Sequence, residues 1–172
     1  GEFGVDHVLV ATLVIRAGAS CIQAELKDFL QVDPKQPAYK DVRYLLVDPS
    51  CSGSGIAGRL DEGLENDDVR NDKSRLQKLA NFQAKILKHA LSFPSAERVV
   101  YSTCSVHEEE NECVVQDVLG QVEGSFELEE LLPSFEHRGL EKFGVGKKCI
   151  RMSAETDATH GFFVACFVKR RE

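Results

Sequence analysis

Short apolar runs alternate with longer amphipathic stretches along this chain, and this alternation predicts its elements. Continuous apolar runs at 42–47 and 97–101 predict strands that are covered on both faces, as in a parallel sheet. Between them, apolar residues at helical spacing predict a helix over 74–91, which Pro94 ends. A second helix is predicted over 107–119. Strands therefore alternate with helices through the middle of the chain.

The two ends of the chain complete this pattern. The apolar run before Gly18 predicts a buried helix over 6–17, and a short strand is predicted over 20–25. Towards the C-terminus, 149–152 and 162–168 both have the composition of strands. Together these elements predict an α/β fold with a mostly parallel sheet, in which the final strand is antiparallel.

Length and composition limit the class of protein. With 172 residues, 42% of them hydrophobic, we expect one domain over 1–172. The longest apolar run is far shorter than the roughly 20 residues that cross a bilayer, and no secretion signal is evident, so we expect a soluble intracellular protein without a membrane partner. Its six cysteines are then expected to be reduced thiols.

The net charge of −7 argues against a domain that holds nucleic acid by bulk charge. Basic side chains nevertheless gather in one segment, namely Arg138, Lys142, Lys147, Lys148 and Arg151. This segment is either a basic edge that contacts an anionic partner or an ordinary solvated loop, and the sequence leaves both interpretations open.

Two cysteines follow the two central strands. Cys51 lies in the run DPSCSGSG, which begins at Asp48, and Cys104 lies in the run YSTCS. In an open α/β sheet, the loops at the carboxyl ends of the strands handle ligands, so both thiols and Asp48 are expected at one pocket. Cys104 also precedes the predicted helix over 107–119, whose N-terminus would favour a thiolate nucleophile. The alternatives are a buried, inert Cys104 and an Asp48 that only caps its loop.

Two other motifs are weaker. The glycine-rich segment 53–58 has the G-x-G-x-x-G spacing of dinucleotide-binding loops, but the acidic residue that should follow, Asp72, lies in a charged stretch with no predicted strand leading to it. Cys104 and His107, with Cys51, have a spacing that could suit zinc. Because no C-x-x-C pair supports this arrangement, we predict no metal site.

The DPSCSGSG and YSTCS runs resemble motifs IV and VI of the Sun-domain RNA cytosine-5 methyltransferases. The segments HRGL at 137–140 and GFFVA at 161–165 are also similar to this family, in particular to its eukaryotic large-subunit rRNA subgroup, Sun-domain family member five. The resemblance runs from Leu13 to Val168. It implies a Rossmann-like methyltransferase fold, S-adenosyl-L-methionine as cofactor, RNA (large-subunit rRNA) as substrate, and a nuclear, nucleolar location.

The resemblance also implies a role for individual residues. Cys104 would attack C6 of cytosine, and Cys51 would assist loss of the C5 proton and release of the product. Asp48 would contact the target base and the cofactor, and Asp28 the adenine of the cofactor. A base inside a stack is out of reach of a thiol, so the target must be single-stranded or flipped out. The RNA path would be lined by Arg138, Lys142, Lys147 and Lys148.

The family's motif I, a glycine loop that cradles the cofactor, has no counterpart before Val8. We therefore expect an N-terminally truncated, partial catalytic domain, and two other functions stay open. One is a non-catalytic fragment that acts as a binding module, which the missing motif favours. The other is a dinucleotide-binding oxidoreductase, which the glycine pattern at 53–58 suggests.

Overall fold

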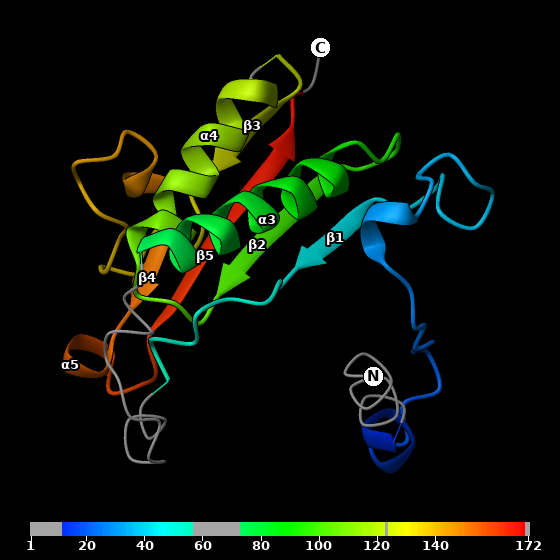
Figure 1. The fold of residues 1–172 in the computed structure, drawn as a ribbon, viewed down its shortest axis with the longest axis horizontal. Helices are drawn as coiled ribbons and strands as arrows, with labels where there is room; N and C mark the ends of the chain where they lie inside the picture. The colour runs from blue at the N-terminus through cyan, green and yellow to red at the C-terminus, as the bar shows by residue number, and fades with distance from the viewer. Residues whose placement is uncertain (1–11, 57–72, 123, 171–172) are drawn as a thin grey trace. The chain divides into compact units, whose positions relative to one another are not determined.

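The computed structural model describes residues 12–56, 73–122 and 124–170, which form two compact units, Gly1–Asp33 and Pro34–Glu172 (Figure 1). In the first unit, residues 12–16 are helical, and the short helix η1 spans Phe29–Gln31. The prediction of a strand over 20–25 is wrong, because this segment has no regular secondary structure and pairs with no described strand. The expected burial of the first helix is also wrong for its described part, because Leu13 and Ile15 are 52% and 77% exposed.

The second unit carries the sheet and its helices. In chain order its strands and longer helices are β1 (Tyr44–Val47), α3 (Lys73–Leu91), β2 (Arg98–Thr103), α4 (Glu112–Val122), β3 (Phe126–Glu129), β4 (Ile150–Met152), α5 (Ala154–Asp157) and β5 (Phe162–Lys169). Two short 3-10 helices, η2 (Glu108–Glu110) and η3 (Gly146–Lys148), lie between these elements.

The sheet has the order β1-β2-β5-β3, with β4 beside β3 along the same edge of β5. Strands β1 and β2 are parallel, whereas β5 is antiparallel to each of β2, β3 and β4. Four strands therefore run in one direction and β5 alone runs in the other. This confirms the α/β fold with a mostly parallel sheet and an antiparallel final strand.

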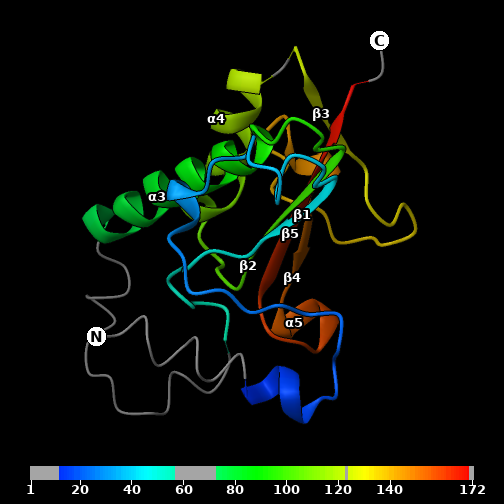
Figure 2. The same cartoon turned by 90° about the vertical axis from the view of Figure 1, so that its right-hand side faces the viewer.

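One face of the sheet is packed against α3 and α4, which lie on the same side of the strands in both views (Figures 1 and 2). The alternation of side chains along β2 and β5 explains this packing, because every second residue is buried. The buried set comprises Val99, Tyr101, Phe163, Ala165 and Phe167 from the strands, and Leu76, Leu87, Val115 and Val118 from the helices. None of the described helices is long and apolar enough to cross a membrane.

The register of β1 on β2 determines where the cysteines meet. Val47, the last residue of β1, pairs with Tyr101 near the end of β2. Because the two strands are parallel neighbours, the loops that follow them leave the sheet at the same edge. The segments that contain Cys51 and Cys104 therefore begin side by side.

Candidate active site

The thiols of Cys51 and Cys104 are in contact, with 3.2 Å between their sulfur atoms, and both residues are half-buried. Residues 48–55 after β1 form what we call the Cys51 loop, and residues 104–107 after β2 form the Cys104 loop. The expectation that two thiols face one site is thus met in the geometry. Asp48 stands at the start of the Cys51 loop, where its Oδ1 accepts a hydrogen bond of 3.0 Å from the hydroxyl of Ser102. This bond joins the ends of β1 and β2 next to the two thiols.

Backbone contacts between glycines hold the two loops together. The amide of Gly55 donates to the carbonyl of Cys104 at 2.9 Å, and the amide of Gly161 donates to the carbonyl of Gly55 at 2.7 Å. A Cβ atom on Gly55 would lie 2.8 Å from the Cys104 carbonyl oxygen and 2.7 Å from that of Gly161. Only glycine permits such a close approach of backbones. The GFFVA segment therefore contributes its first residue to the support of the site.

The flanks of Cys104 are held by Asn111, a fully buried residue between η2 and α4. Its Oδ1 accepts a hydrogen bond of 2.6 Å from the hydroxyl of Thr103, and its Nδ2 donates to the carbonyl of Ser105 at 2.9 Å. Asn111 thus contacts the residue before Cys104 and the residue after it. This arrangement fixes the backbone that carries the Cys104 thiol.

The electrostatic environment distinguishes the two thiols. Burial, followed by the contact with Cys104, raises the pKa of Cys51 to about 11. Cys51 therefore keeps its proton at neutral pH and can donate a hydrogen bond to the sulfur of Cys104.

The predicted helix over 107–119 begins later than expected. A single turn of 3-10 helix, η2, comes first, and α4 begins only at Glu112. The early expectation that a helix N-terminus stabilises a Cys104 thiolate is therefore wrong. The thiol of Cys104 instead contacts the thiol of Cys51.

The four basic residues predicted to contact RNA differ in their surroundings. Arg138 donates to the carbonyls of Leu131 and Leu132, at 2.7 Å each, so its guanidinium holds a local loop. Lys148 donates to a backbone carbonyl, and Lys142 forms a salt bridge of 2.5 Å with Glu108. Lys147 is exposed and makes no hydrogen bond or ion pair within the described part of the chain. Lys147 is therefore the member of the set that is available to a phosphate.

The remaining sequence candidates lie elsewhere. Asp28 belongs to the unit Gly1–Asp33, where its carboxylate caps η1 by accepting from the amide of Leu30 at 3.0 Å. In the glycine-rich segment 53–58, residues 57 and 58 lie outside the described residues, and no helix begins at 53–56. Across the described ranges, no group of three His, Cys, Asp or Glu residues is arranged to hold a metal ion.

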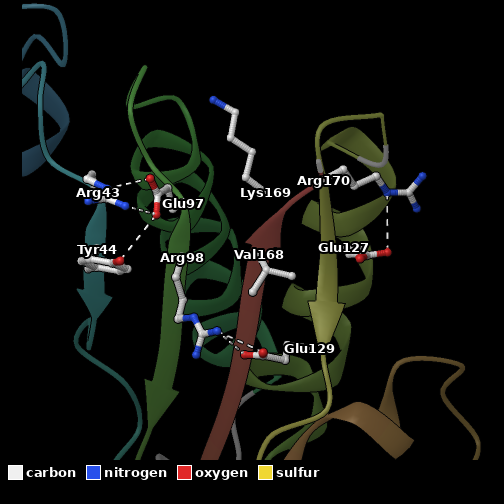
Figure 3. Close-up of a pocket in the computed structure, with 9 residues that line it drawn as sticks. All are labelled: Arg43, Tyr44, Glu97, Arg98, Glu127, Glu129, Val168, Lys169 and Arg170. Atoms are coloured by element: carbon white, nitrogen blue, oxygen red, sulfur yellow. Dashed lines mark hydrogen bonds and ion pairs between the residues drawn. The ribbon is translucent and has the colours of Figure 1, made fainter. Parts of the chain in front are cut away.

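An open polar depression of about 970 Å³ lies at the opposite end of the sheet, where β1 and β2 begin and β5 ends (Figure 3). Its basic side chains are largely matched by acidic ones in the pairs Arg43–Glu97, Arg98–Glu129 and Arg170–Glu127. Because these charges compensate one another and the thiols lie at the other end of the strands, we assign no function to this depression.

Sequence reasoning missed the buried polar residues beneath the thiols. Gln83 of α3, Glu110 of η2 and Asn111 are all fully buried and hydrogen-bonded around the two cysteine loops. Gln83 lies on the apolar face of α3, between Leu76 and Leu87, and this break in the apolar pattern was a signal in the sequence. Glu110 and Asn111 were concealed by the run of acidic residues around them.

Comparison with known proteins gives a consistent assignment. The family model for 16S rRNA methyltransferase RsmB/F matches residues 10–168. The chain is 51% identical over 158 residues to a mouse (Mus musculus) 28S rRNA (cytosine-C(5))-methyltransferase, covering 92% of this chain but 34% of the relative. It thus spans about a third of that relative's length.

Two solved structures from Pyrococcus horikoshii share the fold. A methyltransferase homologue superposes with a TM-score of 0.68 at 24% identity, covering 91% of this chain and 48% of its own. NSun6 with SFG superposes with a TM-score of 0.64 at 22% identity, covering 92% of this chain and 37% of its own. The chain therefore shares the α/β fold of these two structures, and with the family match this confirms the expected Rossmann-like methyltransferase fold. The chain belongs to the RsmB/F family of rRNA methyltransferases, the Sun-domain family that its two cysteine motifs resemble.

Proposed function

We propose that this chain supplies the two catalytic cysteines of an S-adenosylmethionine-dependent RNA (cytosine-5) methyltransferase that acts on large-subunit rRNA. The observation that carries the proposal is the contact of 3.2 Å between the sulfurs of Cys51 and Cys104 at the ends of parallel strands. The mouse relative, whose name states methylation of cytosine C5 in 28S rRNA, supports this substrate class. Because the proposed substrate is rRNA, we expect the activity in the nucleus, in the nucleolus.

In this proposal Cys104 is the nucleophile. Its sulfur forms a bond to C6 of cytosine, and the electron pair displaced from the C5–C6 double bond makes C5 nucleophilic. The bound cofactor supplies the methyl group, which C5 accepts. Loss of the C5 proton then restores the double bond and expels the Cys104 thiolate. On departure, the Cys51 thiol can donate a hydrogen bond to the Cys104 sulfur.

Cys51 and Asp48 have supporting roles. Cys51 assists removal of the C5 proton and release of the product, because it lies beside the sulfur that carries the substrate. Asp48 is exposed, and within the described residues only its Oδ1 is engaged, by Ser102. Its other oxygen is thus available to the target base or the cofactor. A carboxylate at this position suits a cationic methyl donor. The solved structure of NSun6 with SFG, an analogue of S-adenosylmethionine, supports binding of such a cofactor. Asp28 is proposed to contact the adenine of the cofactor.

The RNA is expected to pass the basic residues near α4 and β4. Lys147 is proposed to contact a phosphate directly, because its side chain has no partner in the described part of the chain. Lys142 and Lys148 would have to leave Glu108 and the carbonyl of Leu128 to do so. Arg138 is proposed to shape the edge of this path through its bonds to the backbone. Phosphate contacts of this kind position the RNA and do not read its sequence.

The test is a comparison of two cysteine variants in the intact protein, incubated with rRNA and S-adenosylmethionine. Cys51→Ala should accumulate a covalent protein–RNA adduct that denaturing electrophoresis detects, because attack by Cys104 proceeds and release is slowed. Cys104→Ala should form no adduct and no 5-methylcytosine. An adduct that persists in Cys104→Ala would show that the nucleophile is a different residue.

A further inference from the structure

The side chain of Glu110 connects the Cys51 loop with the Cys104 loop. Its Oε1 accepts a hydrogen bond of 2.9 Å from the backbone amide of Ser52, the residue after Cys51. Its Oε2 accepts a hydrogen bond of 2.5 Å from the hydroxyl of Ser105, the residue after Cys104. One carboxylate thus contacts both loops, each at the position that follows the cysteine.

The described partners of Glu110 all donate to its carboxyl group. The amide of Ser52 and the Nε2 of Gln83, at 2.9 Å, can only donate to Oε1. The Ser105 oxygen already accepts from the amide of His107 at 3.0 Å, and its own hydrogen points to Glu110.

Stability alone does not require a carboxyl group at this position. Glu110 is fully buried, and its described hydrogen bonds all come from neutral donors. Removing a carboxylate from water costs several kcal/mol even after relaxation, and apolar groups of similar volume often replace buried charges without loss. The residue therefore needs an explanation other than a contribution to the core.

Gln83 extends the same support into helix α3. Besides Glu110, its Nε2 donates to the carbonyl of Ser50, the residue before Cys51, at 3.1 Å. The hydroxyl of Tyr101 on β2 lies 3.3 Å from the Oε1 of Gln83 and donates to the backbone carbonyl of Glu110 at 2.6 Å. Glu110 is thereby held by the sheet and by α3, and it has little freedom to follow either loop alone.

We infer that Glu110 is a positioning residue, which sets the separation of the Cys51 and Cys104 thiols by holding the two loops in register. Asn111 is the natural comparison, because its side chain contacts the flanks of Cys104 and not the Cys51 loop. The catalytic consequence rests on the proposed function, but the effect on the distance between the thiols does not.

The effective concentration of the two thiols measures this separation without any substrate. In a glutathione buffer, Cys51 and Cys104 lose two hydrogens and form a disulfide, while one glutathione disulfide is reduced to two glutathione thiols. The equilibrium constant of this exchange reports how closely the two sulfurs are held. The protein is quenched with acid, the free thiols are alkylated, and the fraction of the Cys51–Cys104 disulfide is determined by peptide mass spectrometry.

Glu110→Ala should lower this effective concentration by about tenfold or more, since small displacements of paired groups have large effects on effective molarity. Asn111→Ala should lower it less than about threefold, although it also removes buried hydrogen bonds. Glu110→Gln keeps the volume and one acceptor oxygen, so its value should lie between those of the wild type and Glu110→Ala. Glu110→Gln also gives the answer if the alanine variant fails to fold.

An unchanged equilibrium in Glu110→Gln and Glu110→Ala would overturn the inference, and so would an equal loss in Asn111→Ala, because the effect would then be one of general packing. A second readout links the residue to catalysis. With rRNA and S-adenosylmethionine, Glu110→Gln should form the adduct at a rate near that of the wild type but release it more slowly, because Cys51 is displaced. If no variant forms an adduct, Cys51→Ala included, the proposed function fails while the glutathione equilibrium still decides the role of Glu110.

Discussion

The sulfur atoms of Cys51 and Cys104 lie 3.2 Å apart, although 53 positions separate the two residues in the chain. The parallel pairing of β1 with β2 brings their loops together, and the contacts of Gly55 and Glu110 hold them there. The contact also raises the pKa of Cys51, which leads to a first prediction about the reactivity of this thiol.

Alkylation of Cys51 should be slow at neutral pH. Since burial and the neighbouring Cys104 raise its pKa to about 11, only about one Cys51 in a thousand is a thiolate at pH 8. Its rate of reaction with iodoacetamide should therefore rise about tenfold per pH unit and level off only near pH 11. Time-resolved peptide mass spectrometry between pH 7 and 11 measures this profile.

Cys104→Ser provides the control for this profile. The substitution removes the sulfur that contributes to the raised pKa of Cys51 but leaves its burial, which is the larger cause. The profile of Cys51 should then shift to lower pH without reaching that of a free cysteine. A Cys51 rate that is already maximal at pH 8 in the wild type would contradict the raised pKa of Cys51.

The close approach of Gly55 and Gly161 predicts a second effect. In Gly55→Ala, the new methyl group would collide with the carbonyl oxygens of Cys104 and Gly161, at 2.8 and 2.7 Å. Rigid backbone cannot move aside as a side chain can, so we expect a loss of about 1–3 kcal/mol in the free energy of unfolding. The Cys104 loop should move with it, and the glutathione equilibrium of the two thiols should fall.

Gly120→Ala is a matched control in the same chain. Nothing lies within 4 Å of a Cβ atom at this position of α4, and alanine favours a helix by about 0.5–1 kcal/mol over glycine. Urea denaturation should therefore show destabilisation for Gly55→Ala and none for Gly120→Ala. Equal effects at the two positions would mean that the backbone contact at Gly55 is not tightly packed.

The sequence predicted those parts of the structure that depend on local pattern. The strands at β1, β2, β4 and β5, and helix α3, follow from continuous apolar runs and from helical periodicity. Strand β3 was missed because its four residues, FELE, alternate apolar and charged side chains over too short a length. The predicted strand over 20–25 has strand-like residues but no partner, and strand formation depends on pairing.

The residues of the candidate site also fall into those that local sequence pattern predicts and those that depend on long-range contacts. Cys51, Cys104 and Asp48 could be found because each follows a recognisable strand, and strand ends are where such sheets bind ligands. Glu110 and Gln83 could not be assigned, because their importance depends on contacts across 27 positions of the chain and beyond. The basic residues were identified by charge alone, whereas the hydrogen bonds that engage Arg138 and Lys148 depend on how the loop folds.

A buried ion pair between Glu112 and Arg151 predicts a third effect, on the element that supports the Cys104 loop. Arg151 donates to the two carboxylate oxygens of Glu112 at 2.8 and 2.6 Å, and also to the carbonyl of Val106 at 2.9 Å. Glu112 is fully buried, and the amide of Leu140 donates to it at 2.9 Å. The pair therefore connects β4, the start of α4 and the HRGL segment to the Cys104 loop.

Arg151→Met should destabilise the protein by about 3–5 kcal/mol, because it leaves the Glu112 carboxylate buried without its cation. Adding Glu112→Gln should recover part of this loss, since the double variant no longer buries a charge. Arg43→Met is the control: Arg43 and Glu97 form a similar pair, but their side chains are 57% and 45% exposed, so the loss should be much smaller than for Arg151→Met. Urea denaturation of the four proteins measures these differences, and a loss for Arg151→Met no larger than that for Arg43→Met would show that Glu112 is stabilised without Arg151.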